Sequence, residues 1–238
     1  VDDFKAFRPR RKLMFQIVIC FAIVMLAPLR ITIYFANAPF QIFVTTIWLV
    51  AITNSFNLLD NMDGLSSTVA FFIALGMAIV ALQTNQLFIG GYLLTLMGAV
   101  CAFLLFNFPP ASIFMGDSGS LFIGYSLAVA TVLATFVTPE LTNPLFPILV
   151  PAILFAVPIY DTLSVFAIRW HHGVSILAGD RNHFSHRLLR MGMGPRRVLF
   201  TVALITLATS LGATIPYGSK PWQVVVPLVQ ALAFVGII

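Results

Sequence analysis

Long hydrophobic segments alternate with short polar ones along almost the whole chain of 238 residues. Each apolar segment is about 17 to 25 residues long, the length at which a helix crosses a hydrocarbon core of about 30 Å. We predict about eight such helices, at 13–29, 38–57, 65–82, 88–106, 119–137, 145–168, 197–215 and 222–238. The pattern predicts an all-α, polytopic transmembrane helix bundle, organised as a single domain over residues 1–238.

The amino-acid composition supports a membrane protein. Hydrophobic residues make up 60% of the chain and charged residues only 9%, with a mean hydropathy of +1.00, outside the range of water-soluble domains. Cys20 and Cys101 lie inside apolar segments, without the spacing of a zinc site or a disulfide framework. We therefore expect both cysteines to serve packing.

The charged residues fall on one side of the predicted bundle. If the first helix starts on that side, all of the 13 Lys and Arg except Arg30 and Lys220 lie there. The positive-inside rule makes this side cytoplasmic. The four histidines lie there too, and Glu140 alone among the acidic residues lies opposite. We predict a multi-pass protein of the inner (plasma) membrane with a cytoplasmic site, and the net charge of +5 reflects this topology rather than a nucleic-acid partner.

The segment "NSFNLLDNMDGL" gathers amides and carboxylates at the end of the second predicted helix. A carboxylate at the bilayer centre costs about 2.5 to 3.5 kcal/mol, so we expect Asp60 and Asp63 at a helix end, facing a polar cavity. Gly64 suits such a terminus. Together with Asn54 and Asn57, these side chains offer donors and acceptors for a sugar or base and can hold a cation. An ordinary solvated loop is the alternative.

The segment "FMGDSGS" precedes the fifth predicted helix. We expect Ser118 to cap that helix through its hydroxyl. A helix N-terminus attracts anions, and Asp117 is placed to hold Mg²⁺ between itself and a diphosphate. Simple helix capping is the structural alternative.

The segment "VDDF" carries Asp2 and Asp3 beside a basic run. Two adjacent carboxylates suit magnesium binding or proton transfer next to a phosphate. A juxtamembrane charged segment without chemistry is the alternative.

The segment "DRNHFSHRLL" carries His183, His186 and Arg187. The spacing can place them on one helix face, where they present donors to a phosphate. A zinc half-site is disfavoured, since no Cys and no HExxH accompanies the histidines. Asp161 lies in a predicted helix broken by prolines, and it suits either a functional or a structural hydrogen-bonding role.

Together, "DD" followed by Lys12 and Gln16, "NSFNLLDNMDGL", "FMGDSGSLFIG" and "DRNHFSHRLL" resemble the polyprenyl-phosphate N-acetylhexosamine-1-phosphate transferases of the glycosyltransferase family 4 type. The resemblance implies transfer of a sugar 1-phosphate, N-acetylglucosamine 1-phosphate being favoured, from a UDP-sugar to undecaprenyl or another polyprenyl phosphate. It further implies release of UMP, a requirement for Mg²⁺ with Mn²⁺ as a substitute, and a place in cell-envelope polysaccharide biosynthesis. A homodimer is left open.

The resemblance also implies roles for individual residues. Asp117 matches the magnesium ligand, Asp2 the group that orients or deprotonates the lipid phosphate, and Phe114 an aromatic that stacks on uracil. The implied catalytic set is Asp2, Asp3, Asp63, His183 and His186. The implied substrate-binding set is Asn54, Asn57, Asp60, Phe114, Arg187 and Lys12.

Three positions depart from the common family pattern. The family often has Gly at Asn61, Lys at Arg181 and a further His at Ser185. The "HxSHR" form resembles the N-acetylglucosamine branch more than the phospho-N-acetylmuramoyl-pentapeptide transferases, which are the enzymatic alternative. A membrane transporter that uses the same carboxylates, and a lipid-binding homologue without activity, are the alternatives outside catalysis.

The beginning of the chain suggests that sequence is missing. Val1 is not an initiator Met, and Asp2 and Asp3 follow it directly. The family has further helices ahead of this pair, so the resemblance implies that the chain is a fragment of a longer enzyme.

Overall fold

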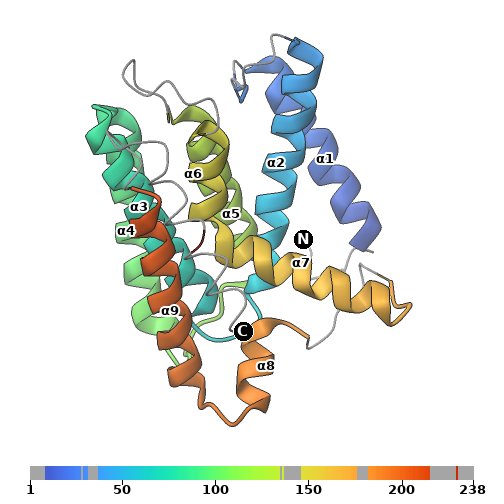
Figure 1. Cartoon of the computed structure of the whole chain (residues 1–238), viewed down its shortest axis with the longest axis vertical. Coiled ribbons are helices and arrows are strands. Elements are labelled where there is room, and N and C mark those ends of the chain that lie inside the picture. The colour runs from blue at the N-terminus through green and yellow to red at the C-terminus, as the bar shows by residue number, and fades with distance from the viewer. Residues whose placement is uncertain are drawn as a thin grey trace.

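The computed structural model describes residues 9–27, 29–31, 37–134, 136, 146–175, 182–214 and 229. Within these residues all regular structure is helical (Figure 1). The helices are α1 (Pro9–Leu26), α2 (Ala38–Leu59), α3 (Leu65–Gln83), α4 (Leu87–Asn107), α5 (Gly116–Leu133), α6 (Phe146–Leu154), α7 (Ala156–His171), α8 (Phe184–Arg190) and α9 (Pro195–Gly212). The predicted all-α bundle is confirmed.

Four of the helices in the described part of the chain are long and apolar enough to cross a membrane, namely α2, α3, α4 and α5. They correspond to the second to fifth predicted segments, and they make this a multi-pass membrane protein. The last predicted segment, 222–238, lies outside the described residues except for Val229. The single-domain organisation remains a prediction.

The sixth predicted segment, 145–168, forms two helices, α6 and α7, as its prolines suggested. Pro151 lies inside α6, and Pro158 is the third residue of α7. Pro158 has no N–H to donate to a preceding carbonyl, so one continuous helix is disfavoured at this point. The chain turns at Phe155, and α7 runs crosswise to α6 in Figure 1.

The core of the bundle is built around α3 and α2. Nearly every turn of α3 contributes buried side chains, and α3 packs against α4 and α9, whereas α2 packs against α1 and α5. A Cβ atom added to Gly124 of α5 would lie 2.9 Å from Phe56 Cβ and 3.0 Å from Thr53 Cα of α2. The missing side chain therefore lets α5 approach the end of α2 closely.

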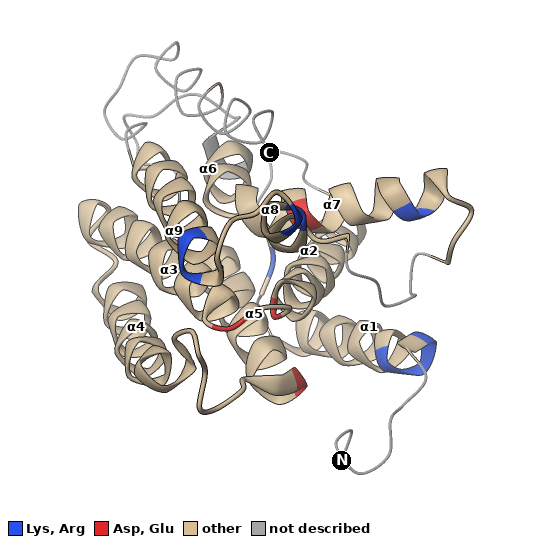
Figure 2. Cartoon of the chain, turned by 90° about the horizontal axis from the view of Figure 1, so that it is seen from below, with Lys and Arg blue, Asp and Glu red and all other residues tan. Residues whose placement is uncertain are grey.

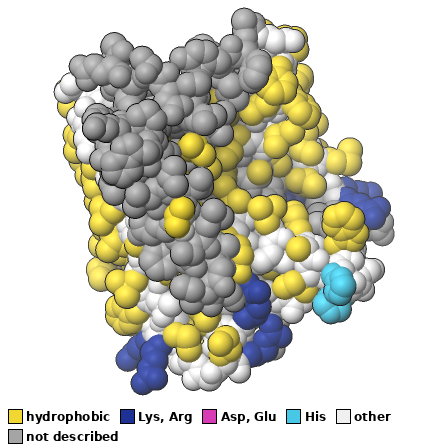
Figure 3. Space-filling model, viewed as in Figure 1, with side chains coloured by type: hydrophobic (Ala, Val, Ile, Leu, Met, Phe, Trp, Pro, Cys, Tyr) yellow, Lys and Arg dark blue, Asp and Glu magenta, His cyan; other side chains and the backbone are white. Residues whose placement is uncertain are grey.

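Polar groups gather at one end of the bundle. Figure 2, seen from below, shows charged positions on the ends of helices that meet there, including α1, α5, α7 and α8. In Figure 3 the basic and histidine side chains lie toward the lower part of the molecule, whereas hydrophobic side chains cover much of the rest of the visible described surface. The loops at this end hold the candidate site.

Candidate active site

Asp117 lies in the first turn of α5, between a cation and an amide. Its Oδ2 accepts a hydrogen bond from Lys12 Nζ of α1, and its Oδ1 accepts one of 2.7 Å from Asn57 Nδ2 of α2. The Asn57 amide also lies 3.0 Å from Ser120 Oγ, one turn further along α5. Three residues from separate predicted motifs, up to 105 positions apart, thus form one polar cluster.

The start of α5 differs from the sequence expectation. The helix begins at Gly116 with Met115 at the N-cap position, so Ser118 lies inside the first turn and the prediction that it caps the helix is wrong. Gly116 has φ of +64°, a conformation that glycine adopts without steric cost. This turn starts the helix three residues earlier than expected, at Gly116 rather than at residue 119, which brings Asp117 into the first turn.

Asp60 is the C-cap residue of α2, and it lies close enough to Asp117 for the two carboxylates to interact electrostatically. Burial disfavours the charged form of Asp60, and the negative charge of Asp117 adds to the effect, so the pKa of Asp60 rises from 3.8 to about 6. Two carboxylates that disfavour each other's ionisation form a place where a divalent cation is stabilised. No group of three or more His, Cys, Asp or Glu suited to a metal occurs among the described residues.

Asp117 and Asp60 supply only part of the ligands that a magnesium ion needs. Mg²⁺ needs few protein carboxylates, because it keeps several waters and takes other ligands from substrate phosphates. Asp117 and Asp60 supply hard carboxylate oxygens, and Lys12 partly neutralises Asp117. The donor set therefore suits a cation that arrives together with an anionic substrate.

The loop after α2 is tied to the segment before α5. Asp63 Oδ2 accepts a hydrogen bond of 3.0 Å from the Ala111 N–H. Gly64, with φ of +71°, donates its N–H to Asn107 Oδ1 at 2.9 Å, and Asn107 Nδ2 donates to the Ile113 carbonyl at 2.8 Å. Gly64 thus lies at a helix terminus as predicted, at the start of α3.

Asn107 is a residue that sequence reasoning missed. Its side chain bridges the two polar loops, and the residue is only 3% exposed. The sequence feature that could have pointed to Asn107 is its position as a single amide at the end of an apolar segment, directly before "FPP". A buried amide of this kind requires hydrogen-bonding partners, although the sequence does not say which.

Asn54 contributes to the structure one turn before Asn57. Its Nδ2 donates to Gln16 Oε1 of α1 and to the Val50 carbonyl, both at 2.8 Å. The bond to Gln16 joins α1 to α2, one turn along α1 from Lys12, whereas the bond to Val50 lies within α2. Gln16 Nε2 is buried and has no hydrogen-bond partner within the part of the chain that the structure describes.

The histidine segment forms a short helix whose start is held by α7. His183 is the N-cap residue of α8 and lies just before the helix, so the predicted helix face shared by all three residues is not formed within α8. The rings of His183 and His186 nonetheless lie near each other in an edge-on arrangement, with centroids 6.5 Å apart and an angle of 62° between the ring planes. His183 Nδ1 lies 2.7 Å from Asp161 Oδ2, and both residues are buried.

Arg187 and Ser185 connect α8 to two other elements. Arg187 Nη2 donates to Tyr160 Oη at 3.2 Å, and the guanidinium lies 5.9 Å from the centroid of that ring. Ser185 Oγ donates to Asn61 Oδ1 at 2.6 Å. Asn61 and Ser185, two of the three positions that depart from the family pattern, are therefore direct partners across 124 positions.

The remaining predicted residues are placed in part. Phe114, just before α5, is 74% exposed, and its ring is open to a flat ligand. Asp2 and Asp3 lie outside the described residues, as does Arg181. Their roles remain predictions.

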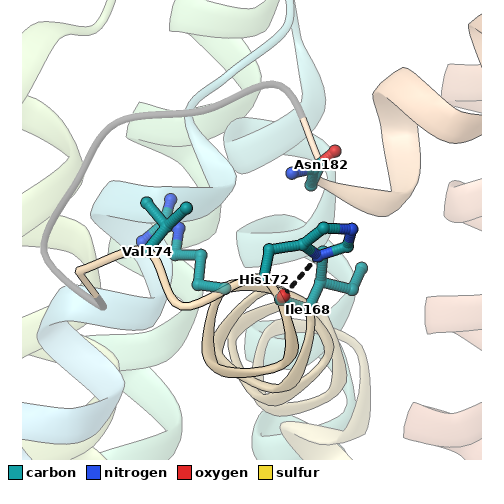
Figure 4. A pocket seen from close by; sticks show the side chains of 5 residues that line it. Ile168, His172, Val174 and Asn182 are labelled. Carbon is teal, nitrogen blue, oxygen red and sulfur yellow. Dashed lines mark hydrogen bonds between the residues drawn. The ribbon is translucent and has the colours of Figure 1, made fainter.

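A cavity of about 280 Å³ lies at the C-terminal end of α7, lined by Ile168, Arg169, His172, Val174 and Asn182 (Figure 4). His172 Nδ1 lies 2.8 Å from the Ile168 carbonyl, which requires a proton on that nitrogen. The cavity adds cationic and amide groups to the polar end of the protein.

The fold and the polar cluster define a multi-pass helical membrane protein with an acidic and basic site at one end. The chain belongs to the family described as Glycosyl transferase family 4, which matches residues 1–135. This confirms the family resemblance inferred from the four motifs.

Named relatives show how far the similarity extends. The chain is 34% identical over 178 residues to the probable undecaprenyl-phosphate N-acetylglucosaminyl 1-phosphate transferase of Bacillus subtilis, covering 75% of this chain and 49% of the relative. It is 29% identical over 212 residues to the decaprenyl-phosphate N-acetylglucosaminephosphotransferase of Mycobacterium tuberculosis (strain H37Rv), covering 83% and 52%. A phospho-N-acetylmuramoyl-pentapeptide-transferase of Clostridium botulinum is 37% identical over 126 residues, covering 53% and 36%. The chain spans about half the length of the first two relatives.

Proposed function

We propose that the protein containing this chain transfers N-acetylglucosamine 1-phosphate from a UDP-sugar to a polyprenyl phosphate and releases UMP. The observation that carries the proposal is the contact of Asp117 with Lys12 and Asn57 at one end of a bundle of membrane spans. Both substrates are anionic and one is a lipid, so the reaction needs cations and carboxylates at a membrane interface. We place this end at the cytoplasmic face of the plasma membrane, because the positive-inside rule favours that side.

The proposed reaction is a direct displacement at phosphorus. An oxygen of the lipid phosphate attacks the phosphorus that bears the sugar, and the bond from this phosphorus to the oxygen it shares with the UMP phosphate breaks. UMP leaves with the electron pair on that oxygen, and the lipid now carries a diphosphate-linked sugar. An ionised phosphate needs no base, so the protein's task is to position the groups and to stabilise charge.

The chain's own residues suit these tasks. Lys12 and Arg187 offer cationic donors for phosphate oxygens, and the exposed ring of Phe114 offers a face for the uracil. Asp117 and Asp60 would hold Mg²⁺, which supplies neutralisation of the diphosphate charge when it is bound. Asn57 fixes the carboxylate of Asp117 through the 2.7 Å hydrogen bond.

A phospho-N-acetylmuramoyl-pentapeptide transfer is the second candidate, favoured by the 37% identity to the Clostridium botulinum relative. That match covers 53% of the chain, whereas the match to the Mycobacterium tuberculosis relative covers 83%. The wider coverage supports the N-acetylglucosamine donor.

The test is an assay of the purified full-length protein with undecaprenyl phosphate and Mg²⁺. We expect UMP release with UDP-N-acetylglucosamine, and little with UDP-N-acetylmuramoyl-pentapeptide. Preference for the second donor would support the second candidate instead. Absence of UMP release with either donor would contradict an enzyme and favour a transporter or a lipid-binding protein.

A further inference from the structure

Asp161 is a buried carboxylate that the proposed reaction does not use directly. It lies on α7 and is only 1% exposed, yet both of its carboxylate oxygens are bonded to the start of α8. Oδ2 lies 2.7 Å from His183 Nδ1, and Oδ1 accepts a hydrogen bond of 2.8 Å from the Phe184 N–H. The two elements are joined across 22 positions by one side chain.

The contact with Nδ1 determines where the ring of His183 carries its proton. An ionised carboxylate only accepts hydrogen bonds, so Nδ1 must be protonated to donate to Asp161. In a neutral imidazole the other nitrogen, Nε2, is then an acceptor. The carboxylate thereby selects one tautomer and one orientation of a ring that is itself only 4% exposed.

The contact with Phe184 satisfies a backbone N–H at the start of α8. The first N–H groups of a helix have no partner inside the helix, and no side-chain cap is made by His183 at the N-cap position. Asp161 supplies the missing acceptor from α7. The beginning of α8 therefore depends on a residue outside it.

The neighbouring residue of α7 holds the next turn of α8. Tyr160 accepts a hydrogen bond from Arg187, and Ser185 is bonded to Asn61 in the loop after α2. Contacts from α7 and from the acidic loop thus orient α8, which presents His186 and Arg187. Asp161 makes the most buried of these contacts.

We infer that Asp161 is a positioning residue that fixes the tautomer of His183 and the orientation of α8. It acts through His183 and Phe184 rather than through contact with a substrate. The inference rests on the proposed function, because the orientation of α8 matters for the transfer of the sugar phosphate.

The test measures two quantities in the full-length protein: which nitrogen of the His183 ring carries the proton, and the rate of UMP release. With histidines labelled with ¹⁵N, the wild-type spectrum should contain a resonance of a neutral ring protonated at Nδ1, which disappears in the His183→Gln variant. Asp161→Asn preserves the size of the side chain but offers only one oxygen, so one of the two contacts is lost. We expect the ring proton of His183 to move to Nε2. We also expect kcat to fall by roughly 10²-fold or more, because a carboxylate that holds an imidazole fixes its tautomer and orientation, and an amide in its place does not.

The matched control is Tyr160→Phe, which keeps the carboxylate and removes only the hydrogen bond to Arg187. It should leave the ¹⁵N signature of His183 unchanged. The double variant of Asp161→Asn with His183→Gln should lose no more activity than His183→Gln alone, because once the ring is gone the one remaining side-chain oxygen at position 161 can still accept the Phe184 N–H.

If His183→Gln removes no resonance of an Nδ1-protonated ring from the wild-type spectrum, the inference is overturned; the second such ring, that of His172, should remain in both spectra. An unchanged ¹⁵N signature of His183 in the folded Asp161→Asn variant would overturn the inference as well. So would a turnover of that variant within about twofold of the wild type. If the wild-type protein releases no UMP, the proposed function fails. The ¹⁵N spectra still decide whether Asp161 controls His183.

Discussion

The side-chain amide of Asn57 donates a hydrogen bond of 2.7 Å to Oδ1 of Asp117 and so ties the end of α2 to the start of α5. Lys12 occupies the second oxygen of the same carboxylate. Since α5 can approach α2 only where Gly124 has no side chain, the polar contact and the packing of the two helices depend on each other.

Asp117→Asn is expected to reduce transfer by at least about 10²-fold, because an amide is a weaker ligand for a divalent cation and a weaker partner for Lys12. UMP release at saturating Mg²⁺ measures the effect, with size-exclusion chromatography to show that the protein remains folded. Ser118→Ala is the matched control and should retain activity, because Ser118 is exposed and does not cap α5. Near-normal turnover of Asp117→Asn would refute its assigned role.

Gly124→Ala is expected to destabilise the protein by about 1 to 3 kcal/mol, because the new Cβ atom would meet α2 at 2.9 to 3.0 Å. Pushing the helices apart also lengthens the Asn57–Asp117 contact, so activity should fall at temperatures where the protein stays folded. Thermal unfolding and UMP release measure the two effects. Gly98→Ala in α4 is the control, since nothing lies within 4 Å of its added Cβ atom. Equal behaviour of the two variants would contradict close packing at Gly124.

Asp60 is expected to make stability depend on pH in the absence of divalent cations. Its pKa rises from 3.8 to about 6 in the folded protein, so between these values the folded state binds more protons than the unfolded chain. Stability from this group therefore falls as pH rises from about 4 to about 6 and is constant above that range.

The Asp60→Asn variant removes this titration. The stability of the wild type relative to the variant should decline on the order of 1 to 3 kcal/mol between pH 4 and pH 6.5. Unfolding followed by tryptophan fluorescence at several pH values measures the difference. A difference that is independent of pH would show that the pKa of Asp60 is not raised.

Asn107→Ala is expected to cost about 2 to 3 kcal/mol, because it leaves the Gly64 N–H and the Ile113 carbonyl without their partner. Activity should fall as well, since both polar loops lose their common anchor. Thr95→Ala, which removes an exposed side-chain bond within α4, is the control and should change little. A stable and active Asn107→Ala variant would show that the loops are held by other contacts.

The sequence by itself determined the four membrane spans α2 to α5 and the family. Crossing a bilayer depends on hydropathy summed over about 20 consecutive residues, which is a local property. The alternation of crossings also predicted that the motifs around Asp60, Asp117 and His183 would gather at one end. The break between α6 and α7 followed from the prolines, since a missing N–H acts on its own helix.

Only the tertiary structure decided which polar groups are partners. The pairs of Lys12 with Asp117 and of Asp161 with His183 depend on how helices pack, and no local pattern states that packing. The bridge made by Asn107 and the early start of α5 at Gly116 are of the same kind. A hydrogen bond requires two atoms within about 3 Å, a condition set by the positions of whole helices rather than by residues near each other in sequence.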